Sequence, residues 1–318
     1  IMLFDLRPKE RREELYGREK ELEELHRLVR SEWVVILGRR MMGKTSLLKV
    51  FLNEVNGIYV NLSGVRSIRG FVEELLKHVR RLDMEFRIGP VSISWTRLAE
   101  DVFSRFEGRV VGLDEVQELP SNYMLKLLKK IWDTYDIRLV FTGSLVGVIT
   151  GLLEPTSQSP LYGRQPARIE LKPFPRDVSI EFLVNGFREF GVTPPIAEIE
   201  EAVESLNGYP GWLVYYGNMR CVRNLGHREA LERVYSEGKQ ILLQELKKFL
   251  TTRKYPERYI KLLKLLPARW SELKNSLAVN AKTLAEMLNS LEKAMIIEKK
   301  GNTYTIPDPI MRRLVLDL

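Results

Sequence analysis

The chain has 318 residues, of which 44% are hydrophobic and 29% are charged, so its composition predicts folded units with charged surfaces and excludes a largely disordered protein. A single cysteine, Cys221, excludes an internal disulfide framework, and with three histidines it supplies too few donors for a recognisable metal cluster. The formal net charge of +8 permits contact with nucleic acid without establishing it. No apolar run is long enough to cross a bilayer, so we expect a cytoplasmic protein without membrane contact.

The first half of the chain alternates between apolar strands and amphipathic helices. Short apolar runs predict strands at 33–37, 57–62, 109–114, 137–142 and 167–171. Helical periodicity predicts helices at 18–30, from residue 44 onward, and at 70–82, 97–106 and 122–134. Residues 84–95 alternate around Gly89-Pro90, which predicts a hairpin. Strands separated by helices at this spacing predict an α/β fold with a mostly parallel sheet.

The pattern changes after residues 171–175. Helical periodicity then dominates, at 177–190, 196–206, 211–222 and 227–250, and a further unit begins near Tyr255. We therefore expect three units of different kinds, at 1–172, 173–252 and 253–318.

The last unit has the pattern of a winged helix-turn-helix. A helix at 257–266 is followed by helices for which Ser271 and Asn280 are the expected caps, and then by two strands around Lys300-Gly301-Asn302. In the DNA-binding version the third helix enters the major groove of double-stranded DNA, and the wing touches the backbone. The candidate contacts are Lys282, Thr283, Asn289, Lys293, Lys299 and Lys300. Because the third helix also carries Glu286 and Glu292, a protein partner stays open as the alternative.

A phosphate-binding loop follows the first strand. The segment "GRRMMGKTS" spans residues 38–46 and contains Gly-x-x-x-x-Gly-Lys-Thr between a buried strand and an amphipathic helix. Glycines let backbone N–H groups approach a diphosphate, Lys44 reaches the β- and γ-phosphates, and the Thr45 hydroxyl is placed to bind Mg²⁺. The expected nucleotide contacts are Gly38, Arg39, Arg40, Met41, Met42, Gly43, Lys44, Thr45 and Ser46. The motif leaves the side chains at 39–42 unspecified, so solvent, the nucleotide and a partner subunit all stay open as their surroundings.

Two adjacent carboxylates complete the predicted chemistry. Asp114 and Glu115 follow the apolar strand "VVGL". Asp114 would complete the magnesium shell, and Glu115 would polarise the attacking water. A built-in base beside the metal ligand favours a hydrolase over a kinase. The chain has no Asn-Lys-x-Asp guanine-reading motif, which disfavours a GTPase. The cofactors expected are therefore ATP or ADP and Mg²⁺.

Three further residues are candidates for sensing the γ-phosphate. Thr142 and Ser144 lie where the strand at 137–142 ends, and a plain strand-to-helix turn with a serine cap is the alternative for them. Arg164 in "SPLYGR" is a candidate for contacting the γ-phosphate of its own subunit or of a neighbour, with a solvated arginine as its alternative.

Taken in order, these motifs resemble the archaeal P-loop ATPases of the AAA+/STAND type. The resemblance covers nearly the whole chain, from "YGREKELEEL" through the loop, "VVGLDEVQEL", "FTGS", "SPLYGR", "LKPFPRDVSIEFL" and "NGYPGWLVYYG" to "YTIPDPIMRRLV". It implies a P-loop NTPase sheet with the strand order 5-1-4-3-2, a helical lid and a winged helix. It also implies that Tyr16, Gly17 and Arg18 lie by the adenine and that Pro210 brings the lid to the nucleotide. Arg164 then becomes an arginine finger or sensor.

Three hypotheses follow for the function. The first is a DNA-associated ATPase in which ATP closes the lid and the winged helix grips duplex DNA. The second is a signalling switch in which nucleotide exchange releases the winged helix to bind a protein, with slow turnover. A nucleotide-dependent homo-oligomer stays open under each hypothesis. The third is a nucleotide-binding scaffold with little hydrolysis.

Overall fold

The computed structural model describes residues 2–81 and 94–318, so most of the hairpin expected at 84–95 lies outside the described residues. The chain divides into two compact units. The sheet unit comprises Pro8–Gly38 and Gly43–Leu171, and the helical unit comprises Ile1–Arg7, Arg39–Met42 and Lys172–Leu318. The division expected within the helical unit, between residues 252 and 253, stays a prediction.

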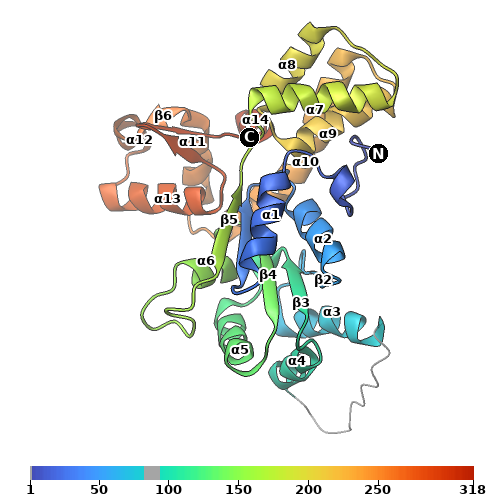
Figure 1. Cartoon of the computed structure of the whole chain (residues 1–318). Coiled ribbons are helices and arrows are strands. Elements are labelled where there is room, and N and C mark those ends of the chain that lie inside the picture. The colour runs from blue at the N-terminus through green and yellow to red at the C-terminus, as the bar shows by residue number, and fades with distance from the viewer. Residues whose placement is uncertain (1, 82–93) are drawn as a thin grey trace. The chain divides into compact units, whose positions relative to one another are not determined.

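The sheet unit is built on five parallel strands (Figure 1). They are β1 (Val34–Gly38), β2 (Ile58–Asn61), β3 (Val110–Asp114), β4 (Arg138–Gly143) and β5 (Ala167–Leu171). The sheet order is β2-β3-β4-β1-β5, which confirms the strand order that the resemblance implied. Every residue of β1 is buried, as expected for a central strand covered on both faces. The sheet and its helices form the α/β fold of P-loop NTPases.

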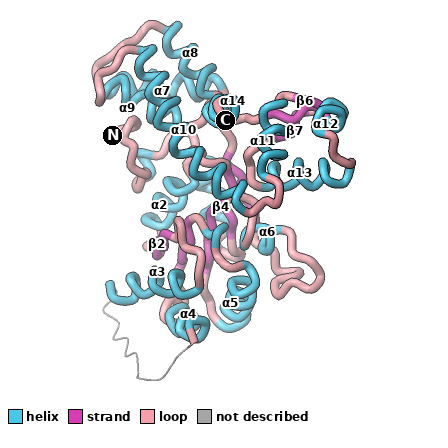
Figure 2. The backbone as a smooth tube through the Cα atoms, turned by 180° about the vertical axis from the view of Figure 1, so that it is seen from behind, coloured by secondary structure: helices cyan, strands magenta, loops and turns pink. Residues whose placement is uncertain are grey.

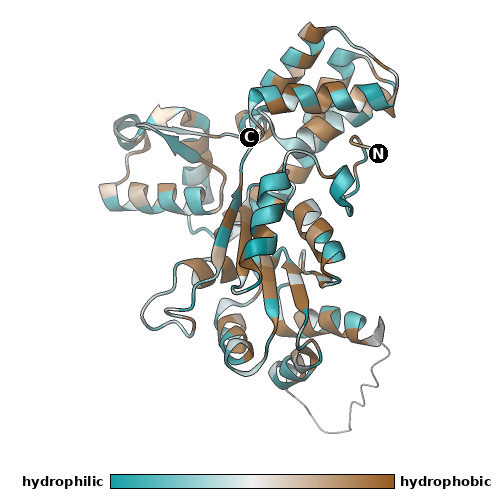
Figure 3. Ribbon diagram, viewed as in Figure 1, coloured by the Kyte–Doolittle hydropathy of each residue, from teal (hydrophilic) through white to brown (hydrophobic). Residues whose placement is uncertain are grey.

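Six α-helices belong to the described part of this unit. They are α1 (Glu19–Leu28), α2 (Lys44–Glu54), α3 (Ile68–Arg81), α4 (Trp95–Ser104), α5 (Ser121–Thr134) and α6 (Val148–Leu153). Figure 3 shows hydrophobic colour along the strands and hydrophilic colour on α1, whose buried residues are Leu22 and Leu25. Helix α6 fits the strand-to-helix turn that was the alternative for Thr142 and Ser144, but its N-cap is Gly147 and the expected serine cap is not formed.

The helical unit contains four consecutive helices and then a group that includes a three-stranded sheet (Figure 2). The four consecutive helices are α7 (Arg176–Glu189), α8 (Ile196–Leu206), α9 (Pro210–Cys221) and α10 (His227–Thr251). The group with the three-stranded sheet contains α11 (Pro256–Leu265), β6 (Ala268–Arg269), α12 (Trp270–Leu277), α13 (Ala281–Lys293), β7 (Glu298–Lys300), β8 (Thr303–Thr305) and α14 (Pro309–Leu316). Across residues 2–81 and 94–318, each helix is too short or too polar to span a bilayer.

The amino-terminal segment is anchored in the helical unit by Phe4. Its ring is fully buried and makes edge contacts with Phe182 and Phe187 at centroid distances of 5.8 and 5.5 Å. Gly186 and Gly217 make room for this ring, because a Cβ at either position would lie within 2.3 Å of it. Two helical glycines therefore create a socket, and residues 1–7 belong with helices that follow them by more than 150 residues.

Asp308 joins α14 to α9. Its carboxylate caps α14 by accepting the backbone N–H of Ile310 at 2.9 Å and also accepts Trp212 Nε1–H at 3.1 Å. Asn207 adds a second link by donating to the Pro307 carbonyl at 2.8 Å. Because Asp308 and Trp212 are both buried, α14 is held to α9 by a desolvated hydrogen bond and not by a surface contact.

We predict that Asp308 makes stability depend on pH. Burial raises the pKa of Asp308 to about 6, and nearby Glu245 adds to the rise. Between about pH 4 and 6 the folded chain therefore binds more protons than the unfolded chain, so the free energy of unfolding falls as pH rises through this window, by up to about 3 kcal/mol. The Asp308→Asn variant keeps an acceptor oxygen but loses the titration. Melting curves at several pH values should show that the free energy of unfolding falls in the wild type only. The same pH dependence in wild type and variant would contradict the role of Asp308.

The two expected caps have different outcomes. Asn280 caps α13, since its side chain accepts the Thr283 N–H at 2.8 Å, which confirms that prediction. The Ser271 prediction is wrong, because α12 begins at Trp270 with Arg269 as its N-cap. The Glu272 carboxylate accepts the Arg269 N–H at 2.7 Å, so the helix begins two residues earlier than expected and Ser271 falls inside it.

Candidate nucleotide site

The loop between β1 and α2 has the geometry of an anion site. Gly43 adopts the left-handed conformation, with a φ of 92°, and leaves open space where a Cβ would be. Within residues 2–81 and 94–318, no side chain caps the amino terminus of α2, the end at which a helix presents N–H groups to an anion. Lys44 is buried and its Nζ donates to the Gly38 carbonyl at 2.6 Å, which folds the ammonium back over the loop.

Asp114 is the centre of a buried hydroxyl cluster in the sheet unit. It is 2% exposed and accepts hydrogen bonds from Thr45 Oγ1 at 2.9 Å, from Tyr59 OH at 2.6 Å and from Thr142 Oγ1. Burial and the charge of Asp114 raise the pKa of Tyr59 far above its usual range, so the phenol stays a donor. Helix α2 and strands β2 and β4 thus each give one hydroxyl to the carboxylate at the end of β3.

Glu115 occupies the same carboxyl edge of the sheet in a constrained conformation. Its φ is 58°, in the left-handed region that a residue with a side chain rarely adopts. The backbone is held there because its N–H donates to Thr142 Oγ1 at 2.9 Å. Gln117 Nε2 donates to Glu115 Oε2 at 2.5 Å, and Lys44 Nζ lies 4.0 Å from Oε1. A carboxylate is therefore positioned beside the lysine of the loop.

This donor set fits a magnesium nucleotide. A hydroxyl and a carboxylate, Thr45 and Asp114, are the hard oxygen ligands that Mg²⁺ prefers, and they lie 2.9 Å apart. The uncapped helix terminus and Lys44 supply the donors and the positive charge that a polyphosphate needs.

The structure also places the other residues of the sheet unit that the sequence predicts to contact the nucleotide. Ser144 follows β4 at the same edge and is half-buried, and the Ser46 hydroxyl accepts the Lys9 N–H at 3.0 Å. Gly17 is left-handed with a φ of 70° and precedes α1. Arg18 is buried, 3.7 Å from Glu21, and desolvation lowers the pKa of its guanidinium to about 10. Tyr16 is half-buried next to them, and an adenine contact by these residues stays a prediction.

Arg164 does not join the site of its own chain. It precedes β5, whose first residue, Ala167, pairs with Val34 at the start of β1, so Arg164 lies at the amino end of the sheet. The phosphate-binding loop is at the opposite, carboxyl end, after Gly38. Arg164 instead lies 3.4 Å from Asp133 of α5. The expectation that Arg164 contacts the γ-phosphate of its own subunit is therefore corrected. The length of the parallel strand β1 separates Arg164 from the loop.

Residues 39–42 of the loop are grouped with the helical unit. Arg39 Nη2 lies 3.2 Å from Glu298 Oε2 of β7, and both side chains are largely buried. The Met41 carbonyl accepts the Gly211 N–H at 2.8 Å, next to Pro210 at the first turn of α9. Met42 is buried and Arg40 is exposed. The loop side chains that the motif left unspecified are thus partly used in contacts with β7 and α9.

We predict that Arg39 and Glu298 are energetically coupled. Their side chains are 16% and 25% exposed, so solvent screens the pair only in part. A double-mutant cycle with Arg39→Gln and Glu298→Gln should give a coupling free energy of about 1 kcal/mol in unfolding experiments. Arg39→Gln combined with Glu292→Gln on exposed α13 is the matched control and should be additive. Additivity in both cycles would show that the interaction between Arg39 and Glu298 contributes nothing to the free energy of unfolding.

The expected DNA contacts occupy α13 and β7. Lys282, Asn289, Lys299 and Lys300 are exposed, and Thr283 and Lys293 are half-buried. Lys300 Nζ lies 3.3 Å from Glu298, and Lys299 Nζ lies 5.5 Å from the centre of the Tyr304 ring.

Three residues that contact the site residues were missed in the sequence. Tyr59 and Gln117 hold Asp114 and Glu115, and Glu298 pairs with Arg39. A signal existed for Gln117, a polar residue two positions after Glu115, and for Tyr59, which interrupts the apolar pattern of β2. Glu298 gave no such signal, since it is 259 residues from Arg39.

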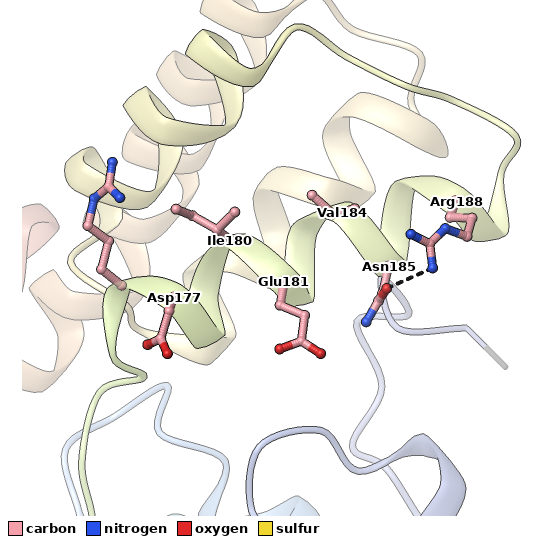
Figure 4. Close-up of a pocket in the computed structure, with 7 residues that line it drawn as sticks. Asp177, Ile180, Glu181, Val184, Asn185 and Arg188 are labelled. Atoms are coloured by element: carbon pink, nitrogen blue, oxygen red, sulfur yellow. Dashed lines mark hydrogen bonds between the residues drawn. The ribbon is translucent and has the colours of Figure 1, made fainter.

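A shallow hollow on the helical unit carries no comparable chemistry. It follows one face of α7, between Arg176 and Arg188 (Figure 4). Its charged lining residues are Arg176, Asp177, Glu181 and Arg188, and Arg188 donates to Asn185 at 3.2 Å. Asp177 and Glu181 are exposed, unlike the buried Asp114, so we do not take the hollow as a second candidate site.

Comparisons with known proteins agree with this site. A family model described as an ATPase domain predominantly from Archaea matches residues 15–216, more than half of the chain. The Walker-type ATPase PABY2304 of Pyrococcus abyssi is 32% identical, with a TM-score of 0.83 and 99% of each chain covered. The fold is also similar to Aeropyrum pernix ORC2 in ADPNP and ADP complexes (14% identity, TM-score 0.67, 99% and 96% covered) and ORC1 in complex with DNA (14%, 0.53, 95% and 93%).

A comparison with curated proteins found no match. The family match spans the phosphate-binding loop, Asp114 and Glu115. The chain therefore belongs to the family of ATPase domains found predominantly in Archaea and is an ATPase.

Proposed function

We propose that the chain is a Mg²⁺-dependent ATPase of the AAA+/STAND type that couples its nucleotide state to a carboxyl-terminal winged helix. The observation that carries this proposal is the cluster in which Thr45, Tyr59 and Thr142 converge on Asp114 while Glu115 lies beside Lys44. It combines nucleotide binding with a base, which a passive scaffold does not need.

Each residue of the cluster has a role in hydrolysis. The loop N–H groups and Lys44 bind the phosphates, and Thr45 and Asp114 hold the magnesium ion. When bound, that ion neutralises charge on the phosphate oxygens. Glu115 accepts the proton of the attacking water, and Thr142 fixes its backbone by accepting its N–H. Ser144, at the end of the neighbouring strand, is a further γ-phosphate contact.

We assign Arg164 to the site of a neighbouring subunit. It lies at the amino end of the sheet and is 38% exposed at its side chain, so a second copy of the chain has access to it. In this arrangement Arg164 is an arginine finger in trans, and the active form is a nucleotide-dependent homo-oligomer.

The helical unit is proposed to sense the nucleotide. Residues 173–252 form a lid, with Pro210 at the start of α9 and with Tyr16–Arg18 by the adenine. Residues 253–318 form a winged helix, with α13 as the recognition helix and the β7–β8 hairpin as the wing. The order of α11, β6, α12, α13, β7 and β8 supports this proposal.

Double-stranded DNA is the partner we propose for the winged helix. The net charge of +8 and the exposed Lys282, Asn289, Lys299 and Lys300 support it. The fold is also shared with an ORC1 protein whose structure contains DNA. The site of action is the cytoplasm. The second candidate is a switch whose winged helix binds a protein, which the acidic residues Glu286 and Glu292 on α13 favour.

An ATPase assay with and without duplex DNA tests the proposal. We expect Mg²⁺-dependent turnover by the wild type, none by Lys44→Ala, and a change in rate or in mass when DNA is added. Mass is measured with ATP, with ADP and without nucleotide. Turnover that DNA leaves unchanged, together with an unchanged mass, favours the protein-binding switch. A wild type without turnover contradicts the enzymatic mechanism itself.

A further inference from the structure

The positive charge of the chain is concentrated where α10 gives way to α11. Residues 247–264 contain seven basic residues and one acidic residue, a net +6 within a chain whose net charge is +8. By contrast, residues 281–300, which hold all the expected DNA contacts, contain four basic and three acidic residues. Sequence-independent affinity for nucleic acid comes from cations that contact phosphates. The charge therefore points to α11, and not to α13.

Four cations form what we call the basic face: Lys254, Arg258, Lys261 and Lys264. All four are exposed, and the last three recur every three residues on α11, so that they lie on successive turns. Leu262 and Leu263 of the same helix are buried and attach α11 to the rest of the helical unit. The one acidic residue of the segment, Glu257, is also exposed. Figure 2 shows α11 following α10 within this unit.

Aromatic rings hold several of these cations in place. The Tyr255 ring lies 4.3 Å from the Arg258 guanidinium and 5.4 Å from Lys254 Nζ. Arg253, just before the basic face, lies 4.2 Å from the Phe249 ring and 5.7 Å from the Tyr259 ring. Cation–π contacts of this kind fix a charged group without cancelling its charge.

Carboxylates do not neutralise the basic face. Among residues 2–81 and 94–318, none of its four members forms an ion pair. Other cations of the helical unit do: Arg220 lies 3.2 Å from Glu198, and Arg313 lies 3.2 Å from Glu232. These two cations of the unit thus form structural pairs, whereas the four of the basic face are left for an external anion.

We propose that the basic face is the surface that contacts the phosphate backbone of double-stranded DNA. This inference rests on the proposed DNA association and moves its main electrostatic contact from α13 and the wing to α11. A phosphate backbone fits because its charges repeat along a line, as the cations of α11 do along the helix.

Two variants that each remove four cations test the inference. In the first, Lys254, Arg258, Lys261 and Lys264 are replaced by Gln. In the second, Lys282, Lys293, Lys299 and Lys300 are replaced by Gln. Binding of a fluorescein-labelled random-sequence duplex is measured by anisotropy over a series of salt concentrations. Circular dichroism and thermal melting check that the full-length variants are folded.

We expect the first variant to lose about 3–4 from the slope of log K against log salt and to bind roughly 10²-fold more weakly. The second should lose clearly less. Suppose that the wild type binds duplex and the second variant loses as much affinity and salt slope as the first, or more. The assignment of the basic face is then overturned, while the DNA association stands. If the wild type binds no duplex at low salt, both the proposed DNA association and the assignment of the basic face to it are overturned. Binding of phosphatidylserine vesicles through the basic face without duplex binding also overturns the inference.

Discussion

We expect replacement of Glu115 with Gln to lower ATP turnover by about 10²–10⁴-fold, the contribution of a general base to a proton transfer, and to leave ATP affinity nearly unchanged. The amide keeps the size of the side chain and can still accept a hydrogen bond from Gln117, which donates to Glu115 at 2.5 Å. It cannot accept the proton of water. Turnover is measured by phosphate release, and affinity by titration with a fluorescent ATP analogue.

Glu118→Gln is the matched control for this result. Glu118 is three residues further along and lies 3.5 Å from Arg66 at the surface. Its replacement makes the same chemical change outside the hydroxyl cluster, so turnover should stay within about twofold of the wild type, as for other surface changes. Normal turnover by Glu115→Gln would remove Glu115 from the mechanism and revive the hypothesis of a scaffold that only binds nucleotide.

The second large effect concerns Lys44. Lys44→Met keeps an unbranched side chain of similar length, but it removes the buried ammonium that lies over Gly38 and 4.0 Å from Glu115. At an ATP concentration about 100 times the wild-type Kd, ligand binding stabilises the folded chain by about 2.7 kcal/mol. A hundredfold weaker variant keeps only about 0.4 kcal/mol of this. The ATP-dependent rise in melting temperature should therefore nearly vanish.

The control for Lys44 is Lys126→Met, an exposed position on α5. It removes the same charge from the sheet unit and should leave the full ATP-dependent rise. An unchanged rise in Lys44→Met would show that the loop binds nucleotide without its lysine. Because the free variant also loses the hydrogen bond to Gly38, its melting temperature without ATP is recorded as well.

Much of the nucleotide site could be predicted from the sequence because its parts are local. The loop from Gly38 to Thr45 is one continuous segment whose glycines, lysine and hydroxyl act at fixed spacing. Asp114 follows directly on an apolar strand, and parallel strands end at the same edge of a sheet. Neighbouring residues thus carry enough information to place a phosphate site and a metal ligand.

The helical contacts of the chain could not be predicted in this way. Phe4 fills a socket made by Gly186 and Gly217, and Trp212 donates to Asp308. These partners are separated by about a hundred residues or more, and each of them has an ordinary local explanation as a core residue or a cap. Only the packed chain shows which partner each one has.

The sequence by itself therefore determined the α/β class, the phosphate-binding loop and the pair Asp114–Glu115, since periodicity and spacing encode them locally. The tertiary structure decided the rest. It showed that Tyr59 and Gln117 hold the two carboxylates, and that Arg39 pairs with Glu298. It also placed Arg164 at the far end of the sheet from the loop. The reason is that hydrogen bonds and ion pairs depend on the distance between two groups in space. The order of residues determines that distance only for residues within the same strand or within a few turns of the same helix.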